Sequence, residues 1–84
     1  MNMKILKFSA SWCGPCKMLS MTIKGIEDQI PYPVEEIDID VNTEMAQKYS
    51  IRGVPTMVLV DGDKEVKRKV GAMTTPELKQ FLSI

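Results

Sequence analysis

Histidine is absent from this 84-residue chain, and cysteine occurs only twice. The absence of imidazole excludes every mechanism that needs a histidine base. A tetrahedral zinc site normally takes four cysteine or histidine ligands. This chain could therefore hold zinc only by recruiting carboxylates or by sharing a site with a second chain. We expect the protein to bind no metal and no other cofactor.

Net charge and long apolar runs are also missing. Eleven basic residues balance eleven acidic ones, whereas nucleic acids and anionic membranes favour a basic surface. No apolar run approaches the ~18 residues of a membrane span, and the first residues, MNMKILKFSASW, lack the apolar core and cleavage site of a signal peptide. We expect one domain, residues 1–84, in the cytoplasm, without nucleic-acid or membrane partners.

The hydrophobic pattern predicts the element order β-α-β-α-β-β-α. Strands are expected at residues 3–8, 34–40, 56–60 and 64–70, and helices at 15–29, 42–49 and from Thr74 or Thr75 to Leu82. The first β-α-β unit should be parallel and right-handed, and the DGD turn at 61–63 predicts an antiparallel hairpin. The sequence therefore predicts the α/β class, with a four-stranded mixed sheet flanked by helices.

The two cysteines lie three residues apart in the stretch WCGPC, residues 12–16. Three interpretations compete: a structural disulfide, half of a metal site, or a redox-active dithiol. A structural disulfide is rare in the cytoplasm, and one that closes so short a loop adds little stability. The ligand count argues against the metal site, so the redox dithiol is favoured.

The expected chemistry follows from placing Cys13 at a turn and Cys16 in the first turn of a helix. This spacing brings both sulfur atoms to the helix N-terminus, where free N–H groups and the helix dipole stabilise a thiolate. Pro15 suits a first helical turn, and Gly14 leaves the approach of a substrate open. We expect Cys13, as the sulfur nearer the surface, to attack a substrate disulfide, and Cys16 to resolve the mixed disulfide.

The sequence resembles the thioredoxin family in three segments: WCGPCK at 12–17, IRGVPT at 51–56 and VGAM at 70–73. They occur in the family's order and spacing, and the match runs through essentially the whole chain. The resemblance implies a thioredoxin fold in which Pro55 is cis and faces the dithiol. It also implies a substrate-binding groove formed by Trp12, Gly53, Val54, Pro55, Gly71, Ala72 and Met73.

The chain departs from that family in length. Full-length thioredoxins begin with a strand and a helix that have no counterpart before residues 3–8, so the resemblance implies a glutaredoxin-sized core with a thioredoxin active site. Glutaredoxins usually grip glutathione with a Gly-Gly pair followed by an acid. Residues 71–74 are GAMT, without an acid, which disfavours glutathione binding.

A second departure concerns charge beneath the dithiol. The family places an acid in the first strand and a lysine on the neighbouring strand, and these positions fall at Lys7 and Glu36. Our hypothesis is that the polarity is swapped: Lys7 holds Glu36, and Glu36 or a water relays a proton for Cys16. The alternative is that Lys7 extends its amine to solvent and has no role.

These observations predict a monomeric thiol-disulfide oxidoreductase that reduces disulfides in protein substrates. The chain has no dinucleotide fingerprint, so a separate enzyme of the thioredoxin reductase type is expected to regenerate the dithiol. One alternative is a glutaredoxin-like reductase that uses glutathione. Another is a scaffold subunit that binds a partner and in which the dithiol is incidental.

Overall fold

A four-stranded mixed sheet forms the centre of the computed structural model, which describes residues 2–84. The strands are β1 (Met3–Ser9), β2 (Val34–Asp38), β3 (Thr56–Asp61) and β4 (Lys64–Val70). They lie in the order β2-β1-β3-β4, with β1 and β2 parallel and the other two pairs antiparallel. The predicted sheet and its element order are confirmed.

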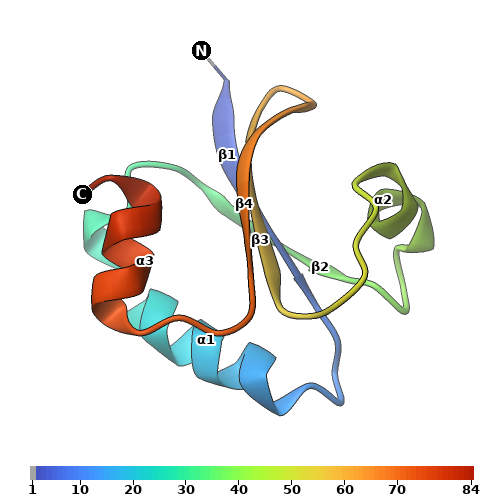
Figure 1. Ribbon diagram of the computed structural model, residues 1–84, viewed down its shortest axis with the longest axis horizontal. Helices are drawn as coiled ribbons and strands as arrows, with labels where there is room; N and C mark the ends of the chain where they lie inside the picture. The colour runs from blue at the N-terminus through green and yellow to red at the C-terminus, as the bar shows by residue number, and fades with distance from the viewer. Residues whose placement is uncertain (1) are drawn as a thin grey trace.

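The helices cover both faces of this sheet (Figure 1). They are α1 (Gly14–Gly25), α2 (Thr43–Lys48) and α3 (Thr75–Leu82), with a short 3₁₀ segment, η1 (Glu27–Gln29), after α1. Figure 1 shows α1 and α3 side by side on one face and α2 on the other. None of the helices within residues 2–84 has the length and apolarity needed to cross a membrane.

Alternation along β1 divides the core into two clusters. Ile5 belongs to the cluster beneath α1 and α3, whereas Leu6 and Phe8 belong to the cluster on the α2 side. Successive side chains of a strand point to opposite faces, so Lys7 and Ser9 lie on the same face as Ile5. This alternation directs a lysine of the central sheet toward α1.

Two predicted boundaries were wrong. The helix expected at 15–29 ends at Gly25, and the chain continues through Ile26, with φ −128°, into the separate η1 segment. Gly25 has low helix propensity, and the N–H of Ile26 bonds back three residues to the carbonyl of Ile23, as in a tightened last turn. The strand expected at 34–40 ends at Asp38, where the chain turns toward α2.

The end signals of the later elements are confirmed. The Asn42 side chain accepts a hydrogen bond from the N–H of Met45 at the start of α2. Thr74 and Glu77 form a reciprocal capping box at the start of α3. Gly62, with φ +66°, occupies the β3–β4 turn in a conformation that favours glycine. Each of these local features holds an element at the boundary that its sequence predicts.

Candidate active site

The two cysteines lie at the N-terminus of α1, directly after the turn that follows β1. Cys13 is the N-cap residue, and its Sγ accepts a hydrogen bond of 3.1 Å from the backbone N–H of Cys16. The two residues form a disulfide with their Cα atoms 5.3 Å apart. Gly14 and Pro15 between them are exposed, and Pro15 occupies the first helical turn. The sulfur of Cys13 therefore receives a backbone donor where the helix dipole favours negative charge.

The expected difference in exposure between the two cysteines was wrong. Cys13 is 4% exposed and Cys16 is 3% exposed. Both pack with Ala10 in one small cluster, against which Ile39 and Val54 are also packed. The cluster covers both residues of the disulfide-linked pair from the β2 and β3 sides, so they differ in their polar surroundings and not in their exposure.

The segment before β3 lies against this cluster through Val54. The Val54–Pro55 peptide bond is cis, as the family resemblance implied. The carbonyl of Pro55 accepts a hydrogen bond of 2.8 Å from the N–H of Gly71, and the hydroxyl of Thr56 donates to the carbonyl of Gly53 over 2.7 Å. The first of these bonds joins two of the three segments that carry the resemblance, and the second holds the turn within residues 51–56.

Trp12 projects from the other side of the dithiol turn. Its side chain is 67% exposed, and its Nε1–H donates a hydrogen bond of 2.9 Å to a carboxylate oxygen of Asp40. The sequence analysis missed Asp40. The available signal was the acidic residues at the end of the second strand. Because β1 and β2 are parallel neighbours, their carboxyl ends lie side by side, and β1 leads into the turn that carries Trp12. Asp40 holds the exposed indole in one orientation.

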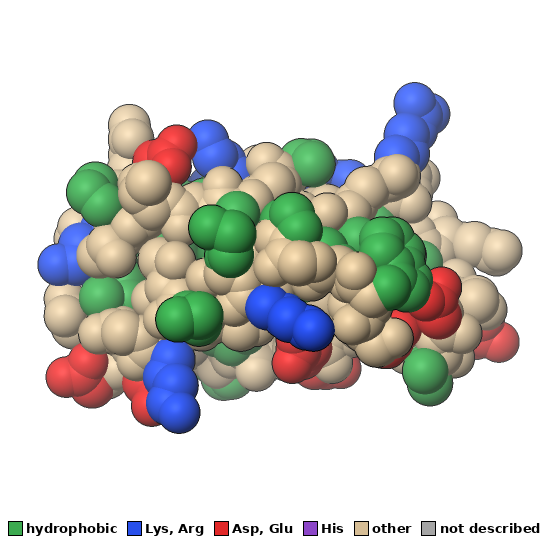
Figure 2. Space-filling model, turned by 90° about the horizontal axis from the view of Figure 1, so that it is seen from below, with side chains coloured by type: hydrophobic (Ala, Val, Ile, Leu, Met, Phe, Trp, Pro, Cys, Tyr) green, Lys and Arg blue, Asp and Glu red, His purple; other side chains and the backbone are tan. Residues whose placement is uncertain are grey.

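A groove between α1 and the start of α3 holds Ala72 and Met73. It has a volume of ≈ 360 Å³, and its lining includes the methionines Met18, Met21 and Met73. Met18 and Met21 of α1 are exposed, whereas Met73 is buried and also belongs to the core. Figure 2, which views the molecule from below relative to Figure 1, shows exposed hydrophobic side chains across the middle of that face.

Of the seven predicted groove residues, Ala72 and Met73 line this methionine groove, whereas the other five do not. Val54 packs against the cysteines, and Gly71 is hydrogen-bonded to Pro55. Trp12 and Gly53 are exposed.

Lys7 and Glu36 form an ion pair beneath the dithiol turn. They are register partners on β1 and β2, and Lys7 Nζ lies 2.7 Å from Glu36 Oε1. The Lys7 side chain is 3% exposed, whereas that of Glu36 is 61% exposed. The hydrogen bond from Lys7 holds the pKa of Glu36 below its usual range, against the opposing effect of partial burial. The predicted contact is present, and Lys7 does not extend to solvent.

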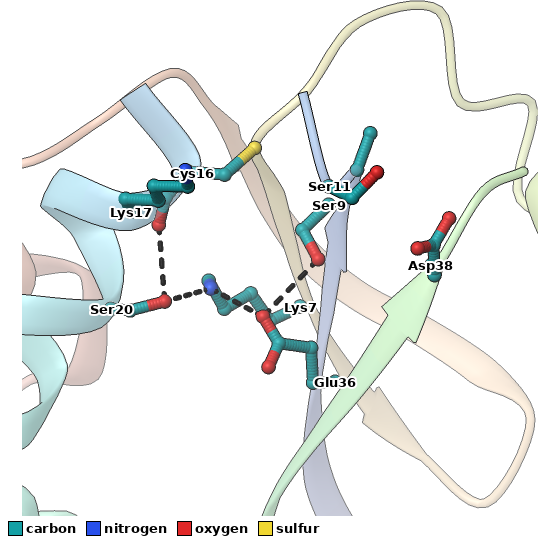
Figure 3. A pocket seen from close by; sticks show the side chains of 9 residues that line it. Lys7, Ser9, Ser11, Cys16, Lys17, Ser20, Glu36 and Asp38 are labelled. Carbon is teal, nitrogen blue, oxygen red and sulfur yellow. Dashed lines mark hydrogen bonds and ion pairs between the residues drawn. The ribbon is translucent and has the colours of Figure 1, made fainter. Parts of the chain in front are cut away.

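Two serines complete a polar network that the sequence analysis missed (Figure 3). Lys7 Nζ also donates a hydrogen bond to Ser20 Oγ, and Ser20 Oγ donates one of 3.1 Å to the carbonyl of Cys16. Ser9 Oγ donates to the same oxygen of Glu36 over 3.2 Å. Ser20 follows Cys16 by four residues and so lies on the same side of α1, which was the available signal.

This network lines a pocket of ≈ 440 Å³ that reaches Cys16. Its other walls include Ser11 and Lys17, together with Asp38 at the end of β2. Within residues 2–84, no three His, Cys, Asp or Glu side chains are grouped so that they could hold a metal ion. What the arrangement offers is thiol chemistry beside a polar, water-accessible pocket.

Comparison with known proteins identifies the family. The thioredoxin family model matches residues 1–84. The chain is 39% identical over 82 residues to a thioredoxin of Buchnera aphidicola, covering 95% of this chain and 75% of that protein. It is 40% identical over 81 residues to a bifunctional thioredoxin reductase/thioredoxin of Mycobacterium leprae, covering 94% of this chain and 18% of that protein.

Among solved structures, a mutant thioredoxin from Halobacterium salinarum superimposes with a TM-score of 0.87 at 35% identity, covering 98% of this chain and 73% of that one. The sheet order, the Cys13–Cys16 disulfide at a helix N-terminus and these matches agree. The chain belongs to the thioredoxin family and is a thiol-disulfide oxidoreductase whose redox-active disulfide joins Cys13 and Cys16.

Proposed function

We propose that this chain reduces disulfides in protein substrates, with Cys13 as the attacking thiolate and Cys16 as the resolving thiol. The observation that carries the assignment is the hydrogen bond from the Cys16 N–H to Cys13 Sγ at the start of α1. A backbone donor and the helix dipole both favour the thiolate over the thiol. Cys16 Sγ has no such role as a helix cap, and its residue borders the pocket that Lys7 lines.

The reaction proceeds in two exchanges. Cys13 Sγ⁻ attacks one sulfur of the substrate disulfide, forms a mixed disulfide and releases the other sulfur as a thiolate. Cys16 then loses its proton, and its sulfur attacks Cys13 Sγ. The Cys13–Cys16 bond forms, the bond to the substrate breaks, and the substrate leaves as a second thiolate. Two electrons have passed from the dithiol to the substrate.

The groove residues are proposed to hold the substrate chain beside Cys13. Val54 packs against the cysteines, and the hydrogen bond from Gly71 to the next residue, Pro55, fixes the neighbouring segment. Trp12 presents an exposed indole on the other side. Gly53 and Ala72 are also exposed, so their backbone is open to a bound peptide. This arrangement supports recognition of an extended segment that carries the substrate disulfide.

The proposed partners follow from the same chemistry. The oxidised protein needs two electrons from elsewhere, and a separate enzyme of the thioredoxin reductase type would supply them. The Mycobacterium leprae relative carries both names in one chain, which supports this pairing. We propose that the protein acts as a cytoplasmic monomer. Its balanced charges support the absence of nucleic-acid and membrane partners.

Lys7 and Glu36 are proposed to serve the resolving step. Glu36 reaches solvent and shares the pocket with Cys16, so it can pass the Cys16 proton outward, directly or through water. The test is the rate at which a preformed mixed disulfide on Cys13 resolves. Glu36→Gln should slow this rate several-fold, while Glu35→Gln, one residue away on β2, should leave it unchanged. Equal resolution rates for the wild type, Glu36→Gln and Glu35→Gln would rule out the relay.

The experiment that tests the proposed function is insulin disulfide reduction with two electron sources in parallel. One arm contains a thioredoxin reductase with NADPH, and the other contains glutathione with its reductase. We expect turnover in the first arm and little in the second. Preferential turnover with glutathione would favour the glutaredoxin-like alternative. If the double variant Cys13→Ser/Cys16→Ser keeps both its partner binding and its cellular function, the scaffold alternative would be favoured.

A further inference from the structure

Lys7 is a buried charged side chain in the central part of the sheet. It lies on the core face of β1 between Ile5 and Ser9, opposite Met57 of β3, and is 3% exposed. Removing an ammonium group from water is costly unless it is paired. A methionine would fill a similar space without that penalty. The ion pair with Glu36 reduces this desolvation cost. A buried charge that stability alone does not require points to a role in the function of the site.

The network connects Lys7 to the helix turn that carries Cys16. Lys7 Nζ donates to Ser20 Oγ, and Ser20 Oγ donates to the carbonyl of Cys16. Lys7 and Cys16 also line the same pocket, and Figure 3 shows the lysine amine between Ser20 and Glu36 on the side of α1 that faces the sheet. The ammonium group is therefore held at one place relative to the resolving cysteine.

Four charged groups share the pocket with Cys16: Lys7 of β1, Lys17 of α1, and Glu36 and Asp38 of β2. Lys17 is exposed and Glu36 is more than half exposed, so water screens both charges. Asp38 accepts a hydrogen bond of 2.8 Å from the N–H of Asp40. Lys7 is the group among these that is almost fully buried, and a buried charge acts through a lower effective dielectric.

We propose that the charge of Lys7 stabilises the thiolate of Cys16 in the reduced protein and so tunes the dithiol toward its reduced form. The inference deepens the proposed function and rests on it, because it assigns a positioning residue to the resolving cysteine. Lys7 transfers no proton: the Cys16 proton leaves through the pocket to solvent. The sulfur then bears the negative charge that the ammonium favours until it attacks Cys13 Sγ.

The first experiment measures the titration of Cys16 alone. In Cys13→Ser, Cys16 is the only cysteine, and the ultraviolet absorbance of its thiolate against pH gives its pKa without any substrate. Adding Lys7→Met should raise this pKa by about one unit, a tenfold change in acid dissociation, which is the lower end of the effect of a nearby charge. Lys7→Gln provides a second uncharged variant should Lys7→Met fail to fold.

The matched control is Lys4→Met. Lys4 lies on the same strand but on the opposite face. It is ion-paired to Glu35 over 2.8 Å, and its side chain is 43% exposed, against 3% for Lys7. It should leave the Cys16 titration unchanged. Titration curves that coincide for wild-type and uncharged residues at position 7 would overturn the proposal, and so would an equal shift in the Lys4 variant.

A second readout is the reduction potential of the protein with both cysteines. At a pH above the pKa of Cys16, a tenfold loss of thiolate stabilisation makes the reduced protein less stable relative to the oxidised one. The reduction potential of Lys7→Met should therefore be about 30 mV more negative than that of the wild type. The two potentials should converge as the pH falls, since a protonated thiol does not sense the charge. A pH-independent difference would overturn the proposal. Failure of insulin reduction with an intact titration shift would instead reject the proposed function alone.

Discussion

The two sulfur atoms have almost equal burial and different neighbours. Cys13 Sγ caps α1 by accepting the N–H of Cys16, whereas Cys16 borders the pocket that contains Lys7. A thiolate gains from a fixed hydrogen-bond donor and from the helix N-terminus. The attacking role that we propose for Cys13 therefore rests on its electrostatic surroundings and not on greater access.

This difference predicts opposite outcomes for two serine variants. Cys13→Ser should abolish insulin reduction, because no thiolate remains to attack the substrate. Cys16→Ser should accumulate mixed disulfides with substrate, because the attacking thiolate remains and the resolving thiol is gone. Mass spectrometry under non-reducing conditions measures the adduct. An adduct that accumulates on Cys16 in Cys13→Ser, with none in Cys16→Ser, would reverse the assignment.

The Lys7–Glu36 pair predicts a pH dependence of stability. The pKa of Glu36 is lowered in the folded protein, so its contribution is present above its ordinary pKa of about 4.5 and is lost as pH falls through the folded value. Glu36→Gln leaves the buried Lys7 without a carboxylate. We expect a loss of ~1–2 kcal/mol at neutral pH, below the value for a fully buried pair because Glu36 is largely exposed.

Urea unfolding at several pH values measures this loss. The difference between wild type and Glu36→Gln should shrink as the pH falls below about 4.5. Glu35→Gln is the control, because the side chains of Glu35 and its partner Lys4 are 50% and 43% exposed, and ion pairs in contact with water contribute little to stability. A difference for Glu36→Gln that persists unchanged into acid would contradict the assigned role of the charge.

At the scale of elements, α3 links stability to the groove. Its buried face consists of Leu78, Phe81 and Leu82, and its first residues continue directly from Ala72 and Met73 of the groove. The helix has eight residues, too few to be stable alone in water. Its N-cap and its contacts with the core must therefore fix where the groove wall lies.

Thr74→Ala should destabilise the protein by ~1 kcal/mol, the usual cost of removing an N-cap hydroxyl. The capping box loses the bond from the Glu77 N–H to the Thr74 hydroxyl. Thr75→Ala, at an exposed position one residue into the helix, should change stability by less than half as much. Thermal unfolding compares the two, and equal losses would show that the cap contributes nothing specific.

Most of the helix and strand boundaries could be predicted from signals between neighbouring residues. The features that were predicted wrongly depend on contacts between residues distant in the sequence. The caps Asn42 and Thr74 and the turn at Gly62 are set by neighbours within three or four residues, so the sequence was sufficient. The low helix propensity of Gly25 weakens α1 locally, but whether the helix ends there or continues also depends on how the chain crosses to β2. The similar exposure of the cysteines arises because Ile39 and Val54, distant in sequence, pack over both.

The polar network around Lys7 was likewise predicted only in part. The register of Lys7 and Glu36 could be anticipated from the family positions and was then observed. Ser20 and Asp40 were missed, because a serine in a helix and an aspartate after a strand are common and carry no specific pattern. Their roles appear only when β1, β2 and α1 are brought together.

For the whole molecule, the surface around the dithiol differs in character from one side to the other. Trp12 and Asp40 lie on one side, and the methionine groove lies between α1 and α3. Met18 and Met21 expose flexible thioethers there, a surface that adapts to varied apolar side chains. A protein substrate bound at Cys13 would extend across this face, whereas a small disulfide would not reach the groove.

Introducing charge into the groove should therefore separate these two kinds of substrate. Met18→Lys and Met21→Lys each place an ammonium where an apolar substrate side chain would lie, so KM for insulin reduction should rise roughly fivefold, equivalent to about 1 kcal/mol of binding. The rate with a small aromatic disulfide should stay within a factor of two. Val66→Lys, an exposed valine on β4 far from the dithiol turn in sequence, controls for the added charge. A parallel loss on both substrates would place the effect on the dithiol itself, and an unchanged KM for insulin would exclude the methionine groove from substrate binding.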